Sequence, residues 1–316
     1  MKTLLYTAAI LSMSLTLASA QSSLKPTAGE RAVPVQMVVT AEPFYGSAVP
    51  LMNKADIRVL QDKTNLTVTE WVPLQGDRAG LELYILIDEK VNPNAAARFD
   101  EIRHFVLNQP VTTAVGIAYM HNGEAKIVQT PTKDHASAAK ALVAPTGTVS
   151  AMADPFNSLS ELINGWIPGA PRREVLVVSD GVDIFENVGY ANMFVDIAVQ
   201  DAQRAGVQVF CFYASGAGHA SHSPALIRGG QAYLAQIAEE TGGEAYFNAN
   251  ELEPSPSFDP YLADLARHFA HQFRITFLAS PVVGHPFRRV TFTTPIPNVE
   301  VTSAHGFYLD AEASRP

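Results

Sequence analysis

The chain has 316 residues, a formal net charge of −9 and 47% hydrophobic residues. That much apolar material can build a core, which excludes an intrinsically disordered chain. The acidic balance argues against nucleic acid and against anionic membrane surfaces as partners, because both select basic patches.

The first twenty residues have the pattern of a secretory signal peptide. Lys2 precedes an apolar stretch from Leu4 to Leu17, and Ala18-Ser19-Ala20 is a small-residue cleavage site. Removal of residues 1–20 leaves 316 − 20 = 296 residues in an extracytoplasmic protein, periplasmic or secreted. No later apolar run approaches the roughly 20 residues that span a bilayer, so we expect no membrane span.

We expect the signal peptide to be cleaved after Ala20, so that the mature chain begins at Gln21. N-terminal sequencing of the exported protein checks this. Cytoplasmic material that retains Met1 would contradict it.

The two ends of the mature chain have the alternation and turn signals of β-strands. In residues 21–78, the runs Ile57–Leu60 and Leu66–Thr69 lie on either side of the turn 62–65. Residues 273–316 return to strands that several prolines interrupt. Neither flank can bury an apolar face alone. We therefore expect the flanks to pair into one β-sandwich, with the central residues inserted between its halves.

Between the flanks, residues 79–272 alternate buried strands with amphipathic helices. Leu81–Ile87 and Glu174–Val178 are nearly continuous apolar runs, typical of strands buried on both faces of a parallel sheet. Asn92-Pro93 and Asp154-Pro155 each place a capping side chain before a proline suited to the first helical position. This order predicts an α/β fold with a doubly wound, mostly parallel sheet.

One pair of strands departs from that order. Residues 113–120 and 125–130 are joined by His121-Asn122-Gly123-Glu124, and Asn-Gly is a strong short-range signal for a tight hairpin. We therefore expect one antiparallel hairpin at an edge of the otherwise parallel sheet.

Two of the predicted buried strands run directly into an aspartate, Asp88 in one and Asp180 in the other. Ligands of doubly wound sheets bind beyond the carboxyl ends of the strands, so both carboxylates are expected at the same edge. Paired carboxylates with hydroxyl groups nearby are oxygen ligands suited to Mg²⁺ or Ca²⁺.

The central residues resemble the von Willebrand factor type A (VWA) domain. Four segments carry the resemblance in the family's order and spacing: LYILIDEKVN, VLVVSDGVD, AQRAGVQVFCFY and LAQIAEETGGEAYF. With their flanking strands, they are similar to the bacterial VWFA-related subset, in which a β-sandwich accompanies the A domain. The resemblance implies a Rossmann-like sheet and an adhesion-type binding module.

The resemblance also implies a metal-ion-dependent adhesion site, from whose pattern this chain departs. The family's Asp-x-Ser-x-Ser motif corresponds to Asp88-Glu89-Lys90-Val91-Asn92, so the aspartate is kept and both serines are lost. The family's threonine corresponds to Thr148 or Ser150, of which Ser150 is the better candidate, and its later aspartate corresponds to Asp180. An ammonium offers only donors and cannot coordinate a cation, so Lys90 disfavours Mg²⁺. We expect a degenerate site with no cofactor, in which Lys90 pairs with Asp88 or Asp180 in the metal's place.

The function that the resemblance implies is the binding of a protein or peptide, without catalysis, at the edge where the degenerate site lies. The residues of that edge are Asp88, Glu89, Lys90, Asn92, Ser150, Asp180 and Asp183.

Two other functions compete with binding. The main alternative is an extracytoplasmic hydrolase on a similar α/β sheet. Against it, no Gly-x-Ser-x-Gly elbow, Walker A loop or Gly-x-Gly-x-x-Gly motif follows any of the predicted strands. An exported solute-binding protein would need two similar α/β lobes, and the sequence contains one run of such elements with β flanks.

Histidines give a weak signal for a second metal site. His268 and His271 have i,i+3 spacing on the last predicted helix, but no partnering cysteine or His-Glu-x-x-His context accompanies them. We expect both to be exposed polar residues at the helix end.

Overall fold

The structure is a computed structural model, and it describes residues 32–45, 48–147, 154–170, 172–183, 192–217, 223–247, 257–281 and 284–309. The predicted signal peptide and Ser150 lie outside the described residues. Within these ranges, no helix has both the length and the apolar character needed to cross a membrane.

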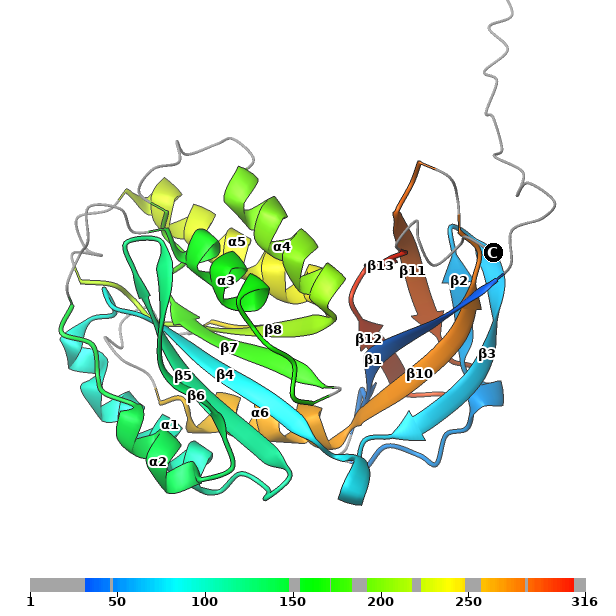
Figure 1. The fold of residues 1–316 in the computed structure, drawn as a ribbon, viewed down its shortest axis with the longest axis horizontal. Helices are drawn as coiled ribbons and strands as arrows, with labels where there is room; N and C mark the ends of the chain where they lie inside the picture. Colours follow the sequence, from blue (N-terminus) through cyan, green and yellow to red (C-terminus); the bar gives the residue numbers. More distant parts are fainter. Residues whose placement is uncertain are drawn as a thin grey trace, which may run out of the picture.

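The described residues form two sheets with associated helices (Figure 1). The strands of the first, the α/β sheet, are β4 (Leu81–Asp88), β5 (Thr113–His121), β6 (Glu124–Thr132), β7 (Arg173–Ser179), β8 (Val207–Tyr213) and β9 (Ala245–Tyr246). Its helices are α1 (Ala96–Leu107), α2 (His135–Ala141), α3 (Pro155–Asn164), α4 (Met193–Ala205), α5 (Pro224–Thr241) and α6 (Asp259–Ala270). The strands of the second, the curled sheet, are β1 (Val33–Pro43), β2 (Arg58–Gln61), β3 (Thr64–Pro73), β10 (Gln272–Ala279), β11 (Phe287–Thr293), β12 (Val299–Ser303) and β13 (Gly306–Tyr308). Short 3-10 helices span Lys54–Asp56 (η1), Gly76–Arg78 (η2) and Pro93–Ala95 (η3).

The α/β sheet is doubly wound and mostly parallel, as predicted. Its strand order is β6-β5-β4-β7-β8-β9, with β6 alone antiparallel to its neighbour among the described strands. The predicted hairpin is confirmed, since β5 and β6 pair at the sheet edge through Asn122 (φ 53°) and Gly123 (φ 78°). Positive φ at both central residues is what a type I′ turn requires.

Helices cover both faces of this sheet, with α1, α2 and α6 on one face and α3, α4 and α5 on the other (Figure 1). Along β4, Leu83, Ile85 and Ile87 enter the first core, whereas Tyr84 and Leu86 enter the second. Because successive side chains point to opposite faces, a strand between two helical layers must be apolar throughout. This explains the unbroken apolar run from Leu83 to Ile87.

The predicted helix boundaries follow from local capping. At the start of α3, Asp154 Oδ1 accepts from the backbone N–H of Phe156 (3.0 Å) and Asn157 (2.9 Å), and Pro155 is the first helical residue. Asn92 Oδ1 accepts from the N–H of Asn94 (3.0 Å), which caps the 3-10 turn η3 that leads into α1.

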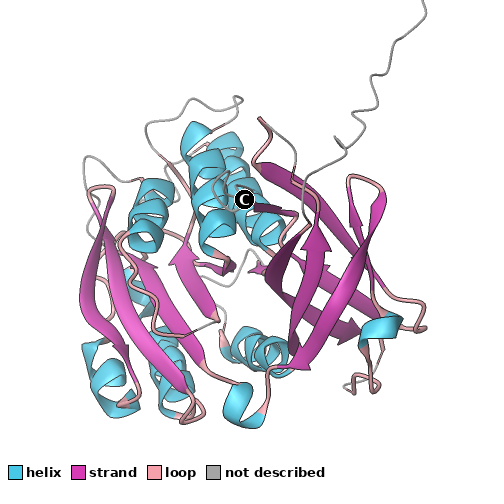
Figure 2. Cartoon of the chain, turned by 45° about the vertical axis from the view of Figure 1, so that its right-hand side comes forward, coloured by secondary structure: helices cyan, strands magenta, loops and turns pink. Residues whose placement is uncertain are grey.

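The curled sheet is built from both ends of the chain, since its strands are blue to cyan and orange to red in Figure 1. Figure 2 shows its strands beside the α/β sheet. Its order is β12-β1-β10-β3-β2-β11-β13, so β10 lies between β1 and β3, and β11 pairs with β2. Its pairing is antiparallel throughout, and a separate core fills its inner face. The predicted pairing of the flanks is therefore confirmed, and the curled sheet fits a flanking β-sandwich. Gln272, expected at the end of the central region, is instead the first residue of β10.

Buried polar side chains join the two sheets. Arg172 donates to the carbonyl of Phe269 (3.0 Å), to Gln272 Oε1 (2.7 Å) and to the carbonyl of Ala79 (2.8 Å). Gln272 in turn donates to Gln208 Oε1 (2.7 Å) on β8. These contacts tie the start of β10 to the α/β sheet.

Candidate functional site

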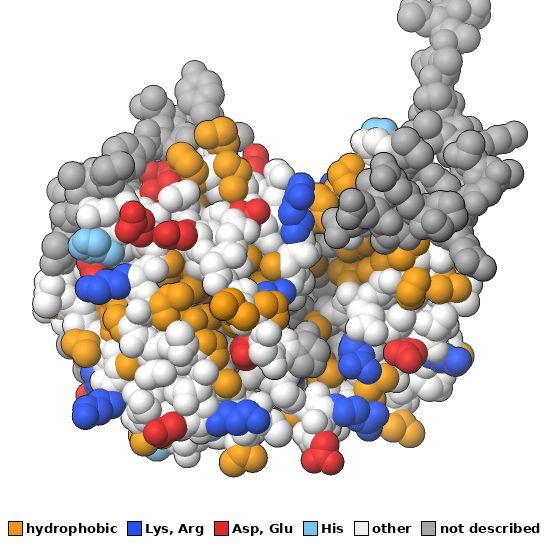
Figure 3. Space-filling view, in the orientation of Figure 1, with side chains coloured by type: hydrophobic (Ala, Val, Ile, Leu, Met, Phe, Trp, Pro, Cys, Tyr) orange, Lys and Arg blue, Asp and Glu red, His pale blue; other side chains and the backbone are white. Residues whose placement is uncertain are grey.

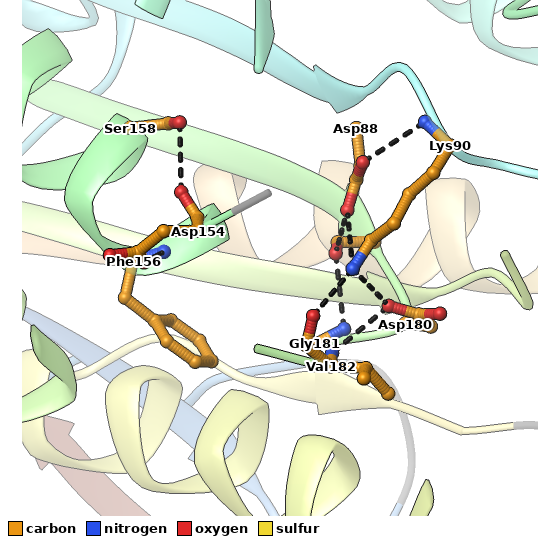
Figure 4. Close-up of polar contacts among 9 residues, drawn as sticks. Asp88, Lys90, Asp154, Phe156, Ser158, Asp180, Gly181 and Val182 are labelled. Carbon is orange, nitrogen blue, oxygen red and sulfur yellow. Dashed lines mark hydrogen bonds and ion pairs between the residues drawn. The ribbon is translucent and has the colours of Figure 1, made fainter. Parts of the chain in front are cut away.

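Asp88 and Asp180 lie together at the carboxyl ends of neighbouring strands, as the sequence predicts. Asp88 ends β4, Asp180 follows β7 directly, and the two strands pair in parallel up to Ile87 and Val178. Both side chains point to one place on the edge of the sheet (Figure 4). Asp88 is 4% exposed and Asp180 is 1% exposed, so the site is a buried cluster rather than an open carboxylate pair.

The ammonium of Lys90 lies between the two carboxylates. Its Nζ is 3.1 Å from Asp180 Oδ1 and 3.6 Å from Asp88 Oδ2, and it donates to the carbonyl of Val182 at 2.5 Å. Only 5% of the lysine side chain is exposed. The expected pairing of Lys90 is confirmed, and it involves both aspartates.

Short local contacts hold the three charged groups in place. Asp88 Oδ1 accepts from the backbone N–H of Lys90 (3.1 Å), and Asp88 Oδ2 accepts from Ser179 Oγ (2.7 Å). The same Ser179 hydroxyl accepts from the N–H of Gly181 (3.0 Å), while Asp180 Oδ1 accepts from the N–H of Val182 (2.9 Å). The strand end of β7 therefore supplies both a charge and the groups that orient its neighbours.

A loop covers this cluster. Val91 forms an isolated bridge with Gly216, and the N–H of Asn92 donates to the carbonyl of Ser215 (2.9 Å). A Cβ at Gly216 would lie 2.6 Å from Asp180 Oδ2, so a side chain there would force the loop away from the carboxylate. The close approach of this glycine explains how three charged groups become buried.

Burial and mutual charge shift the pKa values of the cluster. Burial raises the pKa of Asp88, with Asp180 adding to the rise and Lys90 opposing it. Burial alone would lower the pKa of Lys90, but the two carboxylates outweigh it and the pKa is raised. Lys90 is therefore charged at neutral pH and neutralises one of the two carboxylates.

The donor set does not suit a divalent cation between Asp88 and Asp180. The ammonium already lies within ion-pair distance of both carboxylates, and it has no lone pair to offer a metal. A cation could bind between them only if Lys90 moved out of the cluster.

The other residues of the predicted edge have separate roles. Asp183 is 2% exposed and accepts from Asn192 Nδ2 (3.0 Å). Glu89 lies at the rim, where its carboxylate is 2.6 Å from His121 Nδ1. Asn92 caps the turn before α1, and Ser150 lies outside the described residues.

Sequence reasoning missed Ser179, the carbonyl of Val182 and the covering Gly216. The sequence does contain a signal for Ser179, because this residue directly precedes Asp180 at the end of an apolar strand. The carbonyl and the glycine had none, because their roles depend on how the loops meet in space.

The expectation that His268 and His271 are exposed is wrong for His268. It is 3% exposed, and its ring contacts Phe210 edge-on with 5.3 Å between ring centroids. Helix α6 turns this position toward the sheet, whereas His271 follows the helix and is half-buried.

By strand order and helical layers, this is a protein with a VWA-like α/β domain beside a curled antiparallel sheet. No protein-family model and no curated protein matches the chain. Among solved structures it is similar to BatB from Bacteroides thetaiotaomicron, with a TM-score of 0.43 and 16% identity over 60% of this chain and 97% of that one. It is also similar to an aerotolerance-related membrane protein from Bacteroides fragilis, with a TM-score of 0.43 and 17% identity over 60% and 98% of the chains. For the VWA domain of SpRpn10, the TM-score is 0.37 and the identity 14% over 58% and 94%. These likenesses concern the fold alone.

Proposed function

We propose that the chain is an exported, non-enzymatic, adhesion-type module that binds a protein or peptide at the carboxyl edge of the α/β sheet without a divalent cation. The observation that carries this proposal is the position of Lys90 Nζ, 3.1 Å from Asp180 and 3.6 Å from Asp88. With the ammonium in the metal's place, a positive charge already lies between the two carboxylates, where a divalent cation would have to bind.

The rim of this edge supports recognition by side chains. Glu89 and His121 keep 27% and 46% of their side-chain surface exposed, whereas the charged cluster beneath is closed by the loop at Gly216. Acidic side chains gather at the upper left of the face drawn in Figure 3, over the end of the sheet where the strands finish. A partner at this edge is therefore expected to offer basic or hydrogen-bonding groups.

The hydroxyl nearest the aspartates supports binding rather than catalysis. Ser179 Oγ donates to Asp88, accepts from the N–H of Gly181 and is fully buried. A nucleophile must reach its substrate and transfer its proton to a base. This hydroxyl instead orients a carboxylate inside the cluster.

We expect partner capture by this edge to be insensitive to EDTA and sensitive to charge reversal at the rim. The immobilised mature chain is exposed to an extracytoplasmic extract with and without EDTA, and the bound proteins are quantified. The amount of captured partner should be equal in both conditions. It should fall at least tenfold when the immobilised chain carries Glu89→Arg. The matched control is Asp77→Arg, since Asp77 is exposed in η2 at the amino end of the sheet.

The outcomes separate the parts of the proposal. Loss of the partner in EDTA would overturn metal independence. Equal loss in Asp77→Arg and Glu89→Arg would place binding elsewhere on the molecule. Turnover of a generic ester by the purified chain, abolished by Ser179→Ala, would favour the hydrolase.

A further inference from the structure

A second cluster of ionisable groups lies where the two sheets meet, apart from the edge at Asp88. Asp264 and His268 are one helical turn apart on α6, and Glu244 precedes β9. Glu42 reaches the same place from β1 of the curled sheet. In Figure 1, α6 runs beneath the α/β sheet toward β10 and the curled sheet.

The potential ligand atoms of this cluster converge. One atom from each of Glu244, Asp264 and His268 lies within 4.8 Å of the other two. His268 Nδ1 is 2.9 Å from Glu42 Oε1 and 3.9 Å from Glu244 Oε2. Two ligands at about 2.1 Å from a tetrahedral ion are about 3.4 Å apart. The distances from His268 Nδ1 to Glu42 Oε1 (2.9 Å) and to Glu244 Oε2 (3.9 Å) lie just below and just above this ligand-to-ligand separation.

The histidine is buried without the hydrogen bonds that a buried imidazole needs. His268 is 3% exposed, and within the described residues neither ring nitrogen has a hydrogen-bond partner. The contact of Nδ1 with Glu42 is within ion-pair distance, but its direction does not make a hydrogen bond, and Glu42 Oε1 is likewise buried without one. Such groups are costly to bury. A cation bound in this cluster would give the buried imidazole and carboxylate the partner that they lack.

The surrounding charges favour a divalent ion with affinity for nitrogen. Glu42, Glu244 and Asp264 contribute three carboxylates, and Arg267 pairs with Asp264 Oδ1, which leaves Oδ2 directed at Tyr246. The Tyr246 hydroxyl lies 2.9 Å from Asp264 Oδ2 and 3.2 Å from Glu244 Oε2, and it can donate its one hydrogen to either carboxylate and orient it. Imidazole with carboxylates suits Zn²⁺, whereas Mg²⁺ and Ca²⁺ prefer oxygen donors alone.

We propose that Glu244, Asp264 and His268 bind one Zn²⁺ ion, with Glu42 as the fourth ligand. The ion would join β1 of the curled sheet to α6 and β9 of the α/β domain, as a closed structural site. Glu244 keeps 46% of its side chain exposed, so an ion can enter from solvent. This site is independent of the binding edge and of the function proposed for it.

Calorimetry on the untagged mature chain, after chelation and dialysis, tests the proposal. Titration with ZnCl₂ should show one ion bound per chain with micromolar or tighter affinity. At a free zinc concentration near 100 times Kd, the Tm should rise by about 5 °C. Magnesium chloride should leave the Tm unchanged.

Variants assign the ligands. Asp264→Asn and His268→Gln should each weaken zinc binding at least tenfold and abolish the rise in Tm. The matched control is His305→Gln, because His305 Nε2 lies 3.9 Å from Glu239 Oε1 in an exposed pair elsewhere. If His268→Gln does not fold, zinc binding by Glu244→Gln tests the ligand assignment instead, because the Glu244 side chain is partly exposed to solvent.

Two results would overturn the proposal. One is a folded chain that shows no heat and no change in Tm with zinc, which would leave His268 and Glu42 as an ion pair only. The other is zinc binding that Glu244→Gln and Asp264→Asn leave unchanged, because the ion would then occupy a different site.

Discussion

Lys90→Met should destabilise the protein by about 3–5 kcal/mol, because it leaves Asp88 and Asp180 buried without their cation. The methionine fills much of the same space but carries no charge, so the loss reports the electrostatic role of the ammonium. Urea unfolding followed by circular dichroism measures the difference. The matched control is Lys140→Met, since Lys140 is exposed on α2 and should change stability by less than about 0.5 kcal/mol.

Lys90→Ser should in addition create Mg²⁺ binding between the aspartates. An ammonium about 4 Å from a cation opposes binding by about 4 kcal/mol at an effective dielectric constant near 20, or roughly a thousandfold in affinity. Removing it also restores a hydroxyl at one lost serine position of the Asp-x-Ser-x-Ser pattern. Magnesium should therefore raise the Tm of Lys90→Ser and leave that of the unmutated chain unchanged.

The measurement that would contradict this is calorimetry on the unmutated protein. Micromolar affinity for Mg²⁺ or Mn²⁺, lost in Asp180→Asn, would mean that Lys90 moves away and that the site accepts a metal. Weak binding equal in the unmutated chain and in Lys90→Ser would mean that the ammonium is not the barrier.

Removal of the C-terminal strands should unfold the curled sheet. A chain of residues 21–272 lacks nearly all of β10 and the whole of β11–β13, so β1 and β3 lose the strand between them and β2 loses β11. The apolar faces of the remaining strands would be exposed, and we expect a lower Tm and aggregation compared with residues 21–316. Differential scanning calorimetry and size-exclusion chromatography measure both. Equal stability of the two chains would show that the flanks do not depend on each other.

A point variant tests the same dependence without changing the length of the chain. Phe277 on β10 is fully buried, with ring centroids 6.0 Å from Phe292 and 5.4 Å from Phe307. Phe277→Ala should cost about 3–5 kcal/mol. Phe287→Ala is the matched control, because Phe287 on β11 is 36% exposed and should cost much less.

The sequence by itself determined most of the α/β fold and the pairing of the flanks. Leu83–Ile87 is apolar at every position, and only a strand covered on both faces requires this. The Asn122-Gly123 turn and the Asp154-Pro155 cap specify local backbone geometry, which depends on neighbouring residues alone. The convergence of Asp88 and Asp180 followed from the topology of a parallel sheet.

Only the tertiary structure decided what surrounds these charged groups. Lys90 contacts both aspartates and a carbonyl because the loop at Gly216 closes over it, and no spacing in the sequence encodes that approach. His268 appears in the sequence as a polar residue near a helix end, yet α6 turns it against Glu42 and Glu244 from distant segments. Local patterns report which residues avoid water. The burial and pairing of a charge depend on the groups that the whole fold brings within a few ångströms of it.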